Sequence, residues 1–546
     1  SAASDVYKRQ LEMCDESVAK RKVVKQQLDS LYVLDAKGAQ IRARAKYIED
    51  GEKSTKFFLS LEKERQKCNT IKSLKCGETI YTKDDDLLRI AAEFYDKLFQ
   101  SNMVENKNIS TYLEGVHLEK TLTKEQQEIL EGKISFLECE KVLRLLKFNK
   151  SPGLDGIPAE FYKKFWYKIG NILVQSFNES YDDGILSDSQ RTAVICLIYK
   201  KGDAQLLANY RPISLTNCDY KILAFCLANR IQSIIKSIVS TSQVAYIKDR
   251  FIGCNIRLLE DIIELWESKD YGGVLMMLDF QKAFDSLEWN FLYSVLEKFN
   301  FGHSFIRWVQ TLYCDPVAFV KNNGHLSRPI AIQRGIRQGC PVSALLFIIA
   351  TEILAIAIKQ DPKLRGFSLE ETQHPIKILQ CADDGVLFLN DEVEMGVSIQ
   401  VIESFGKVAG TKLNLSKCEG LWLGRFKDRQ FNCNLYNIKW PTTPIRCLGI
   451  YIGYDKQLLY ALNWSDKIEK IASLLETWKK RELTFFGKIT FIKQLAIPKI
   501  LFSASMLPLP DGIIKELNSI LYNFIWGKCD KLKRNVIINT IECGGL

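Results

Sequence analysis

Three aspartates next to strand-like apolar runs are the side chains of this chain best suited to chemistry. Asp279 ends the run MMLDF, and Asp383 and Asp384 stand together between IKILQC and GVLFL. Successive strand residues point to opposite faces, so the pair can reach one site only across a tight turn, which we expect at Ala382–Gly385. If the strands are neighbours, Asp279 and Asp383 converge on one patch.

Such a patch predicts a bound cation. Clustered carboxylates repel one another unless they are protonated or neutralised. Oxygen ligands without a nearby His or Cys favour Mg²⁺, and two such ions about 3.5–4 Å apart catalyse phosphoryl transfer. An isolated Asp-Asp pair is usually a structural turn, and Asp279 by itself could simply end its strand. The combination of all three predicts metal-dependent phosphoryl transfer.

Composition narrows the class of protein. The 546 residues exceed one simple core, while 47% hydrophobic and 26% charged residues are ordinary for a soluble folded protein. The net charge of +10 is compatible with a polyanionic partner. The closest of the 16 cysteines are eight positions apart and there are only four histidines, so a zinc site is not expected. Dispersed cysteines of this kind are typical of reduced thiols in an intracellular protein.

The elements around the aspartates follow from periodicity. Residues 11–67 have a helical pattern, and 37–67 carry nine Lys/Arg against five acids; this arm is either a solvated helix face or a nucleic-acid surface. Residues 81–148 are predicted to be mostly helical, with starts at Thr123 and Ser135. The apolar run 344–358 contains Glu352 and is short for a membrane span, so we expect a buried helix and no membrane partner.

Other segments are predicted in the same way. A strand at 194–200 is expected to turn at residues 201–203 into NYRPISLT. Further predicted elements are helices at 219–238, 253–268 and 286–299, a strand at 273–280, a loop at 334–341, and helices beyond 456, with one apolar face formed by Ile468, Ile471, Leu475 and Trp478.

Several longer motifs follow one another along the chain. They are AKGAQIRARAKYIEDGEKSTKFFLSLEK (36–63), FNKSPGLDGIPAEFYKKFW (148–166), NYRPISLTNCDYKILA (209–224), LDFQKAFDSLEWNF (278–291), RGIRQGCPVSALLF (334–347), CADDGVLF (381–388), AGTKLNLSKCE (409–419) and CLGIYIG (447–453). This ordered series resembles the reverse transcriptases of non-LTR (LINE-type) retrotransposons.

The resemblance implies an α+β right-hand polymerase with fingers, palm and thumb. We expect a helical N-terminal extension at 1–134, fingers and palm at 135–456, and a helical thumb, truncated at its C-terminus, at 457–546. Residues 1–10 fit the following helix poorly, and we interpret them as a segment foreign to the natural chain. The N-terminal endonuclease and C-terminal Cys/His knuckle of the full element protein are expected to be missing from this fragment.

The resemblance also implies roles for individual residues. Asp279, Asp383, Asp384 and the backbone of Phe280 match the metal site, which takes two Mg²⁺ ions with Mn²⁺ as a substitute. Phe284 matches a steric gate against the 2′-hydroxyl, although a core aromatic is the plainer interpretation. The remaining matches are Lys200 or Lys201 and Arg211 at the triphosphate, Gln338 and Gly339 beside the nascent base pair, Lys417 as the proton donor to pyrophosphate, and Leu448 and Gly449 as the primer grip.

Several points stay open at this stage. Sequence alone does not choose between Lys200 and Lys201, and Lys417 is equally well explained as an exposed lysine. Asp285 is predicted to be a helix N-cap, with Glu288 three positions on. Cys381 replaces the usual aromatic before the aspartate pair, and Cys340 occupies a position that is often acidic; neither removes a metal ligand.

The resulting prediction is an RNA-directed DNA polymerase that extends a primer 3′-hydroxyl with deoxynucleoside triphosphates. Its expected partners are an RNA template and primer or target DNA, with action in the nucleus after a cytoplasmic RNA-bound stage. The alternatives are a catalytically dead RNA-binding remnant, and an RNA-templated RNA polymerase or intron-type maturase. Phe284 disfavours ribonucleotide use, and the arm at 36–67 favours the retrotransposon branch.

Overall fold

The computed structural model describes residues 70–527, apart from residue 270 and residues 369–374, 428–434, 442–443, 480 and 482. The chain divides into two compact units, Ser1–Lys72 and Ser73–Leu546, and the fold below is that of the second. The helix predicted at 11–67 and its basic arm lie outside the described residues.

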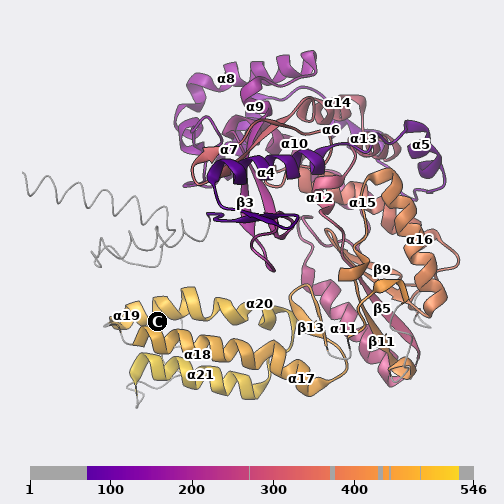
Figure 1. Ribbon diagram of the computed structural model, residues 1–546, viewed down its shortest axis with the longest axis vertical. Coiled ribbons are helices and arrows are strands. Elements are labelled where there is room, and N and C mark those ends of the chain that lie inside the picture. The colour runs from indigo at the N-terminus through magenta and orange to yellow at the C-terminus, as the bar shows by residue number, and fades with distance from the viewer. Residues whose placement is uncertain are drawn as a thin grey trace, which may run out of the picture. The chain divides into compact units, whose positions relative to one another are not determined.

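A four-stranded antiparallel sheet carries the predicted aspartates (Figure 1). Its strand order is β11-β5-β10-β9, and Leu278 pairs with Gly385 across the two central strands. The structure therefore confirms the predicted hairpin. It also confirms that one strand of this hairpin lies beside the strand that precedes Asp279. The strands are β5 (Gly273–Leu278), β9 (Ile378–Cys381), β10 (Asp384–Leu389) and β11 (Glu419–Leu423).

Alternation along β5 divides the apolar side chains between two cores. Val274, Met276 and Leu278 belong to one core, whereas Leu275 belongs to the other. The first core is formed with helices α10 (Cys218–Ile238), α13 (Trp289–Lys298), α15 (Ser343–Gln360) and α16 (Glu392–Ala409), and the second with α11 (Ile252–Ser268) and helices near the C-terminus. The sheet is thus covered on both faces.

Helix α15 is the one described helix long and apolar enough to cross a membrane, but most of it is buried inside the protein. Glu352 within it is only 2% exposed and accepts a hydrogen bond from the Ser240 backbone amide at 3.0 Å. The predicted buried helix is confirmed, and its all-round apolar surface is explained by packing on every side.

A second sheet has the order β4-β3-β6-β7, with β8 also paired to β6. Its β3–β4 hairpin is confirmed, but the turn predicted at 201–203 is too short: the connection runs on through the 3₁₀-helix η1 to Asn209, whose carbonyl accepts from the Lys200 amide at 2.9 Å. The elements are β3 (Thr192–Tyr199), η1 (Leu207–Asn209), β4 (Tyr210–Thr216), β6 (Val317–Asn322), β7 (His325–Leu326) and β8 (Ile330–Ala331).

Helices before the second sheet begin where their caps predict. Thr123 and Ser135 each form a capping box. Each side chain accepts from the backbone amide three residues on, and each backbone amide of Thr123 and Ser135 donates to the side chain of that later residue, Gln126 or Glu138. The segment contains β1 (Leu74–Cys76), β2 (Thr79–Tyr81), α4 (Asp84–Phe99), α5 (Asn106–Glu114), α6 (Lys124–Leu130), α7 (Phe136–Leu145), α8 (Ala159–Asp183) and α9 (Asp188–Arg191).

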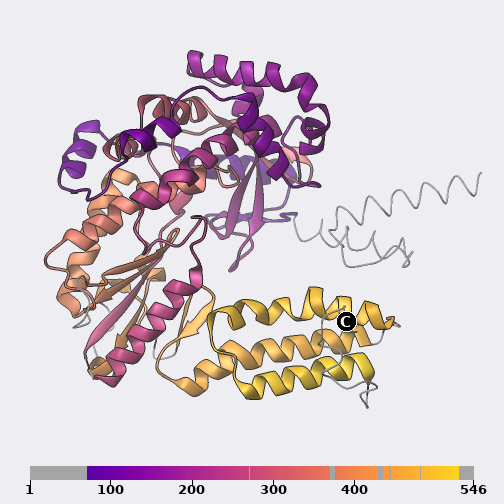
Figure 2. The same ribbon diagram turned by 180° about the vertical axis from the view of Figure 1, so that it is seen from behind.

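The helices near the C-terminus lie side by side in both views (Figures 1 and 2). Ile468, Ile471 and Leu475 are at most 2% exposed, so the predicted apolar face of α18 is confirmed. Helix α20 packs on α11 and so joins this group to the sheet. The helices are α17 (Lys456–Tyr460), α18 (Asp466–Lys479), α19 (Phe485–Phe491), α20 (Pro498–Met506) and α21 (Asp511–Trp526), with π-helical turns η5 (Ala461–Ser465) and η6 (Ile492–Ala496).

Candidate active site

The register of the sheet places the aspartates at the same end of the central strands β5 and β10. Strand β5 ends at Leu278, so Asp279 is the next residue, and Asp384 opens β10 directly before Gly385, the partner of Leu278. Because the strands are antiparallel, the end of β5 and the start of β10 lie at the same edge. Asp279 is half-buried, and Asp384 is exposed.

The turn between β9 and β10 differs by one residue from the prediction. Cys381 pairs with Asp384, so Ala382 and Asp383 are the central residues and Gly385 lies inside β10. Ala382 has φ of 60°, as the first central residue of a type II′ hairpin turn requires. Gly385 serves cross-strand packing instead, because an added Cβ would lie 3.1 Å from the Leu278 side chain.

A buried amide that the sequence analysis did not single out holds this turn. Gln243 is 0% exposed, and its Oε1 accepts from the backbone amides of Ala382 and Ala245, both at 3.0 Å. It lies far from the turn in sequence, in the loop between α10 and α11. No local pattern marks such a contact.

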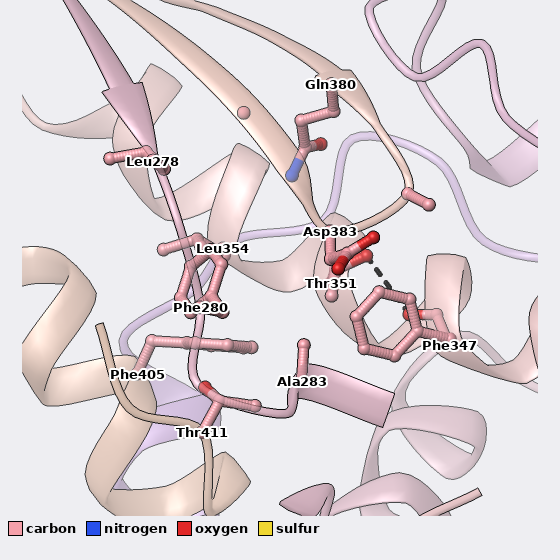
Figure 3. Close-up of a pocket in the computed structure, with 12 residues that line it drawn as sticks. Leu278, Phe280, Ala283, Phe347, Thr351, Leu354, Gln380, Asp383, Phe405 and Thr411 are labelled. Carbon is pink, nitrogen blue, oxygen red and sulfur yellow. Dashed lines mark hydrogen bonds between the residues drawn. The ribbon is translucent and has the colours of Figure 1, made fainter. Parts of the chain in front are cut away.

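The aspartates are electrostatically coupled. Although Asp384 is exposed as a residue, its carboxyl group loses part of its hydration to the protein around it; this loss, followed by repulsion from Asp383, raises the pKa of Asp384 to about 6. The pKa of Asp383 is raised chiefly by burial, and Asp279 adds to the rise. Figure 3 shows Asp383 at a pocket whose other walls include Phe280 and Phe405, which explains the poor solvation of this carboxylate.

Cations face the carboxylates. Lys200, at the end of β3, and Arg211, in β4, both act to lower the pKa values of Asp383 and Asp384. No such effect of Lys201 is found on the described groups of the site. The structure therefore places Lys200, rather than Lys201, beside the aspartates, while the role of either lysine stays a prediction.

Lys282 is a further cation that the sequence analysis overlooked. It has φ of 47° just before α12 (Ala283–Ser286), and its Nζ donates to the Tyr210 carbonyl at 2.6 Å. Burial lowers the pKa of this ammonium, and the nearby charges of Lys200, Lys417 and Arg211 lower it further. The only sequence signal was its position three residues after Asp279.

Two aromatic side chains stand next to these groups. Phe284 stacks on Phe347 with ring centres 4.2 Å apart and planes 16° from parallel, and it is half-buried. Phe280 pairs through its backbone with Leu413. The position of Phe284 is compatible with both interpretations, the steric gate and the core aromatic, so its role stays a prediction.

The loop at 334–341 packs against α12 and against β4. The Ser214 amide donates to the Gln338 carbonyl at 2.8 Å, and the Gln338 Nε2 donates to Asp285 Oδ1 at 2.9 Å. Gly339 has φ of 114°, and an added Cβ would lie 2.8 Å from the Ser214 carbonyl oxygen. Only glycine satisfies both conditions, as the predicted close backbone approach requires.

The N-cap prediction for Asp285 is wrong. Asp285 lies inside α12 at 2% exposure, and the N-cap residue of α13 is Glu288, whose side chain makes no capping bond. Glu288 instead accepts hydrogen bonds from Ser101, Asn102 and Arg334. Burial raises the pKa of Asp285 to about 7. The local pattern predicted a solvated helix start at Asp285, but tertiary packing buries this residue.

The remaining predicted residues lie on two small elements. Lys417 is exposed in the 3₁₀-helix η2 (Leu415–Lys417), which follows the hydrogen bond of 2.7 Å from the Asn414 amide to the Asp279 carbonyl. Leu448 and Gly449 form the turn between β12 (Ile445–Cys447) and β13 (Ile450–Ile452), with φ of 49° and 91°. Burial and, to a smaller extent, Asp384 raise the pKa of Cys447 to about 12, so this hairpin also faces the aspartates.

The donor set suits a hard cation, although no three His, Cys, Asp or Glu side chains within the described ranges are gathered closely enough to hold one. The fit rests on chemistry. The three aspartates offer oxygen ligands, and a divalent cation would relieve the repulsion from Asp383 that, after loss of hydration, raises the pKa of Asp384.

Comparison with known proteins gives one family match. Residues 198–452 match the family described as reverse transcriptase (RNA-dependent DNA polymerase). This range contains Asp279, Asp383 and Asp384, together with the sheet β11-β5-β10-β9 and the β9–β10 and β12–β13 hairpins.

Curated relatives extend the similarity. The transposon TX1 uncharacterized 149 kDa protein of Xenopus laevis is 29% identical over 92% of this chain and 38% of its own length. The Pol polyprotein of the retrotransposable element R2 from Popillia japonica is 22% identical over 56% of this chain and 43% of its own. That of R2DM from Drosophila melanogaster is 25% identical over 50% and 25%. The chain thus spans less than half the length of these relatives.

Proposed function

We propose, from the premise that residues 198–452 are a reverse transcriptase region of the non-LTR retrotransposon type, that this chain copies RNA into DNA by extending a primer 3′-hydroxyl. The observation that carries the proposal is the position of Asp279, Asp383 and Asp384 at the same end of the β5–β10 pair, near Lys200 and Arg211. Acidic ligands on one side and cations on the other suit a metal-bound nucleoside triphosphate.

Asp279, Asp383, Asp384 and the Phe280 carbonyl would hold two Mg²⁺ ions, or Mn²⁺ in their place. When bound, such ions lower the pKa of the attacking hydroxyl and stabilise the leaving oxygen. The pKa of Asp384 is raised by loss of hydration and then by repulsion from Asp383, and a bound cation would relieve that repulsion. The chain's own contribution is therefore a set of carboxylates held at fixed positions by β5 and the β9–β10 turn.

Other residues would bind and orient the nucleotide and primer. Lys200 and Arg211 would contact the triphosphate, Arg211 through its planar guanidinium. Lys417 would supply a proton to the leaving pyrophosphate. Phe284 would exclude a 2′-hydroxyl, with its ring supported by Phe347. Gln338 and Gly339 would border the nascent base pair, and Leu448 and Gly449 the primer end.

A reverse transcriptase region implies a polymerase fold, and the mixture of helices and sheets agrees with it. We assign the palm to the sheet β11-β5-β10-β9, the fingers to the sheet β4-β3-β6-β7 with helices α7, α8 and α9, and the thumb to helices α17 to α21, while α4, α5 and α6 belong to the N-terminal extension. The partners would be an RNA template and a DNA primer, with action in the nucleus. Target-primed integration would also need an endonuclease.

Primer extension tests this function. The protein, an RNA template with an annealed DNA primer, Mg²⁺ and deoxynucleoside triphosphates should give extended DNA. Asp383→Asn should lose at least about a thousandfold in rate, because one metal-binding charge is removed. Asp261→Asn, at an exposed carboxylate of α11, should behave as the parent does.

A parent that binds RNA tightly but extends no primer would contradict the proposal and favour an RNA-binding remnant. Equal extension with ribonucleoside and deoxynucleoside triphosphates would instead favour an RNA-templated RNA polymerase.

A further inference from the structure

Asp285 is a buried carboxylate whose burial is not explained by a capping role in its own helix. It is 2% exposed and caps no helix. Burying a carboxylate costs several kcal/mol unless hydrogen bonds compensate. Within the described part of the chain its Oδ2 has no hydrogen-bond partner, and its Oδ1 accepts from the Gln338 side chain at 2.9 Å.

Gln338 has its backbone fixed independently of this contact. Its carbonyl accepts from the Ser214 amide at 2.8 Å. Two residues earlier, the Ile336 amide donates to the Phe284 carbonyl at 2.7 Å, and the Gly335 amide donates to the Leu287 carbonyl at the same distance. These bonds hold the loop beside α12 but leave the Gln338 amide group free to take either of two orientations.

Asp285 removes that freedom. A glutamine amide has a donor end and an acceptor end that are nearly equal in shape, so its neighbours decide which way it points. Above its raised pKa of about 7, Asp285 is an ionised carboxylate that only accepts, so the NH₂ end must face Asp285 and the Oε1 end must face away. The Gln338 side chain is half-buried, with part of its surface open to solvent.

We infer that Asp285 is a positioning residue that fixes the amide orientation of Gln338 and thereby sets how tightly the incoming nucleotide is bound. The inference rests on the proposed function, in which Gln338 borders the nascent base pair. Asp285 itself would touch no reacting atom, because it is buried and its side chain contacts the site through its hydrogen bond with Gln338.

A double-mutant cycle on the full chain tests this role, with primer extension at pH 8 as the readout. Asp285→Leu keeps the size of the side chain but removes the acceptor, and it should raise KM for the deoxynucleoside triphosphates about tenfold while kcat changes far less. Asp285→Asn retains an acceptor but also offers a donor, so it no longer selects one orientation, and its KM should lie between those of the parent and Asp285→Leu.

Gln338→Met supplies the second arm because it keeps the length of the side chain without the amide. In the Gln338→Met background, Asp285→Leu should raise KM no further. Asp219→Asn is the matched control: Asp219 is 9% exposed and accepts from Gln190 Nε2 at 3.1 Å, the same pairing on α9 and α10. Its KM should equal that of the parent.

An equal KM increase in the Gln338 and Gln338→Met backgrounds would overturn the inference and make Asp285 a purely structural residue. A parental KM in both Asp285 variants would overturn it as well. If Asp285→Leu does not fold, the cycle is run with Asp285→Asn, and thermal melts identify that case. A parent that extends no primer would overturn the proposed function itself and, with it, the role of Asp285.

Discussion

Individual side chains decide which nucleotide the proposed site would accept. Phe284 is held from two sides: its ring stacks on Phe347, and its carbonyl accepts from the Ile336 amide at 2.7 Å. A ring supported in this way cannot swing aside for a larger sugar, because the packed core behind it leaves no space.

We expect Phe284→Ala to admit ribonucleotides. Removing the ring opens room for a 2′-hydroxyl, so the preference for deoxynucleotides should fall by about tenfold or more. The measurement is the ratio of kcat/KM for matched dNTP and rNTP pairs. Phe299→Ala, a buried aromatic of the same core outside the site, serves as the control for general loosening. Unchanged selectivity in Phe284→Ala would exclude the gate.

Asp285 should make stability depend on pH. Its pKa is raised from 3.8 to about 7 in the folded protein, so the folded state binds more protons than the unfolded state between these values. Stability contributed by this group is therefore lost as the pH rises from about 4 through 7. Asp285→Asn should melt a few degrees above the parent at pH 8 and show a smaller difference at pH 5. A difference in melting temperature that does not change with pH would contradict the raised pKa assigned to Asp285.

At the scale of elements, the β9–β10 turn depends on a distant loop. The turn carries Asp383 in its second central position. Its Ala382 amide is satisfied by Gln243, which also receives the Ala245 amide. Loop and turn are thereby tied into one unit beneath the aspartates.

Gln243→Leu should loosen this unit. Two buried amides would lose their acceptor, which costs roughly 1–3 kcal/mol each, so the free energy of unfolding should drop and Asp383 should be displaced. Chemical denaturation and primer extension both report the change. Gln232→Leu, which removes one bond to the Tyr246 carbonyl, is the control and should have a much smaller effect. Parental activity in Gln243→Leu would show that the turn keeps its conformation without the Gln243 hydrogen bonds.

At the scale of the whole molecule, charge rather than shape favours the proposed partner. The net charge is +10, and Lys200, Arg211 and Lys417 lie exposed around the aspartates. The two cores place the β12–β13 hairpin with the helices near the C-terminus on one face of the sheet. Such a surface would bind a nucleic-acid backbone through ion release more than through specific contacts.

Binding of a primer–template duplex should therefore weaken with salt, with the logarithm of the affinity falling linearly against the logarithm of the salt concentration. Asp383→Asn should show the same slope as the parent, since that residue does not contact the backbone phosphates. Fluorescence anisotropy over a salt series measures both. Affinity that does not change with salt would contradict a backbone-binding surface.

Sequence patterns determined the local elements and the identity of the aspartates. The apolar run GVLMMLDF (273–280) predicted β5, the Ser/Thr caps predicted the starts of α6 and α7, and the apolar periodicity predicted the buried face of α18. These features succeed because each depends on residues within a few positions of one another. The order of motifs, likewise readable along the chain, pointed to a reverse transcriptase region.

Only the tertiary structure decided which side chains meet. Gln243 reaches the Ala382 turn, and Gln338 reaches Asp285, across long stretches of chain. The position of Lys282 and the preference for Lys200 over Lys201 likewise became visible only when β3, β4 and α12 were placed together. Burial and hydrogen bonding between distant segments depend on how the elements pack, and packing leaves no periodic trace in the sequence around a single residue.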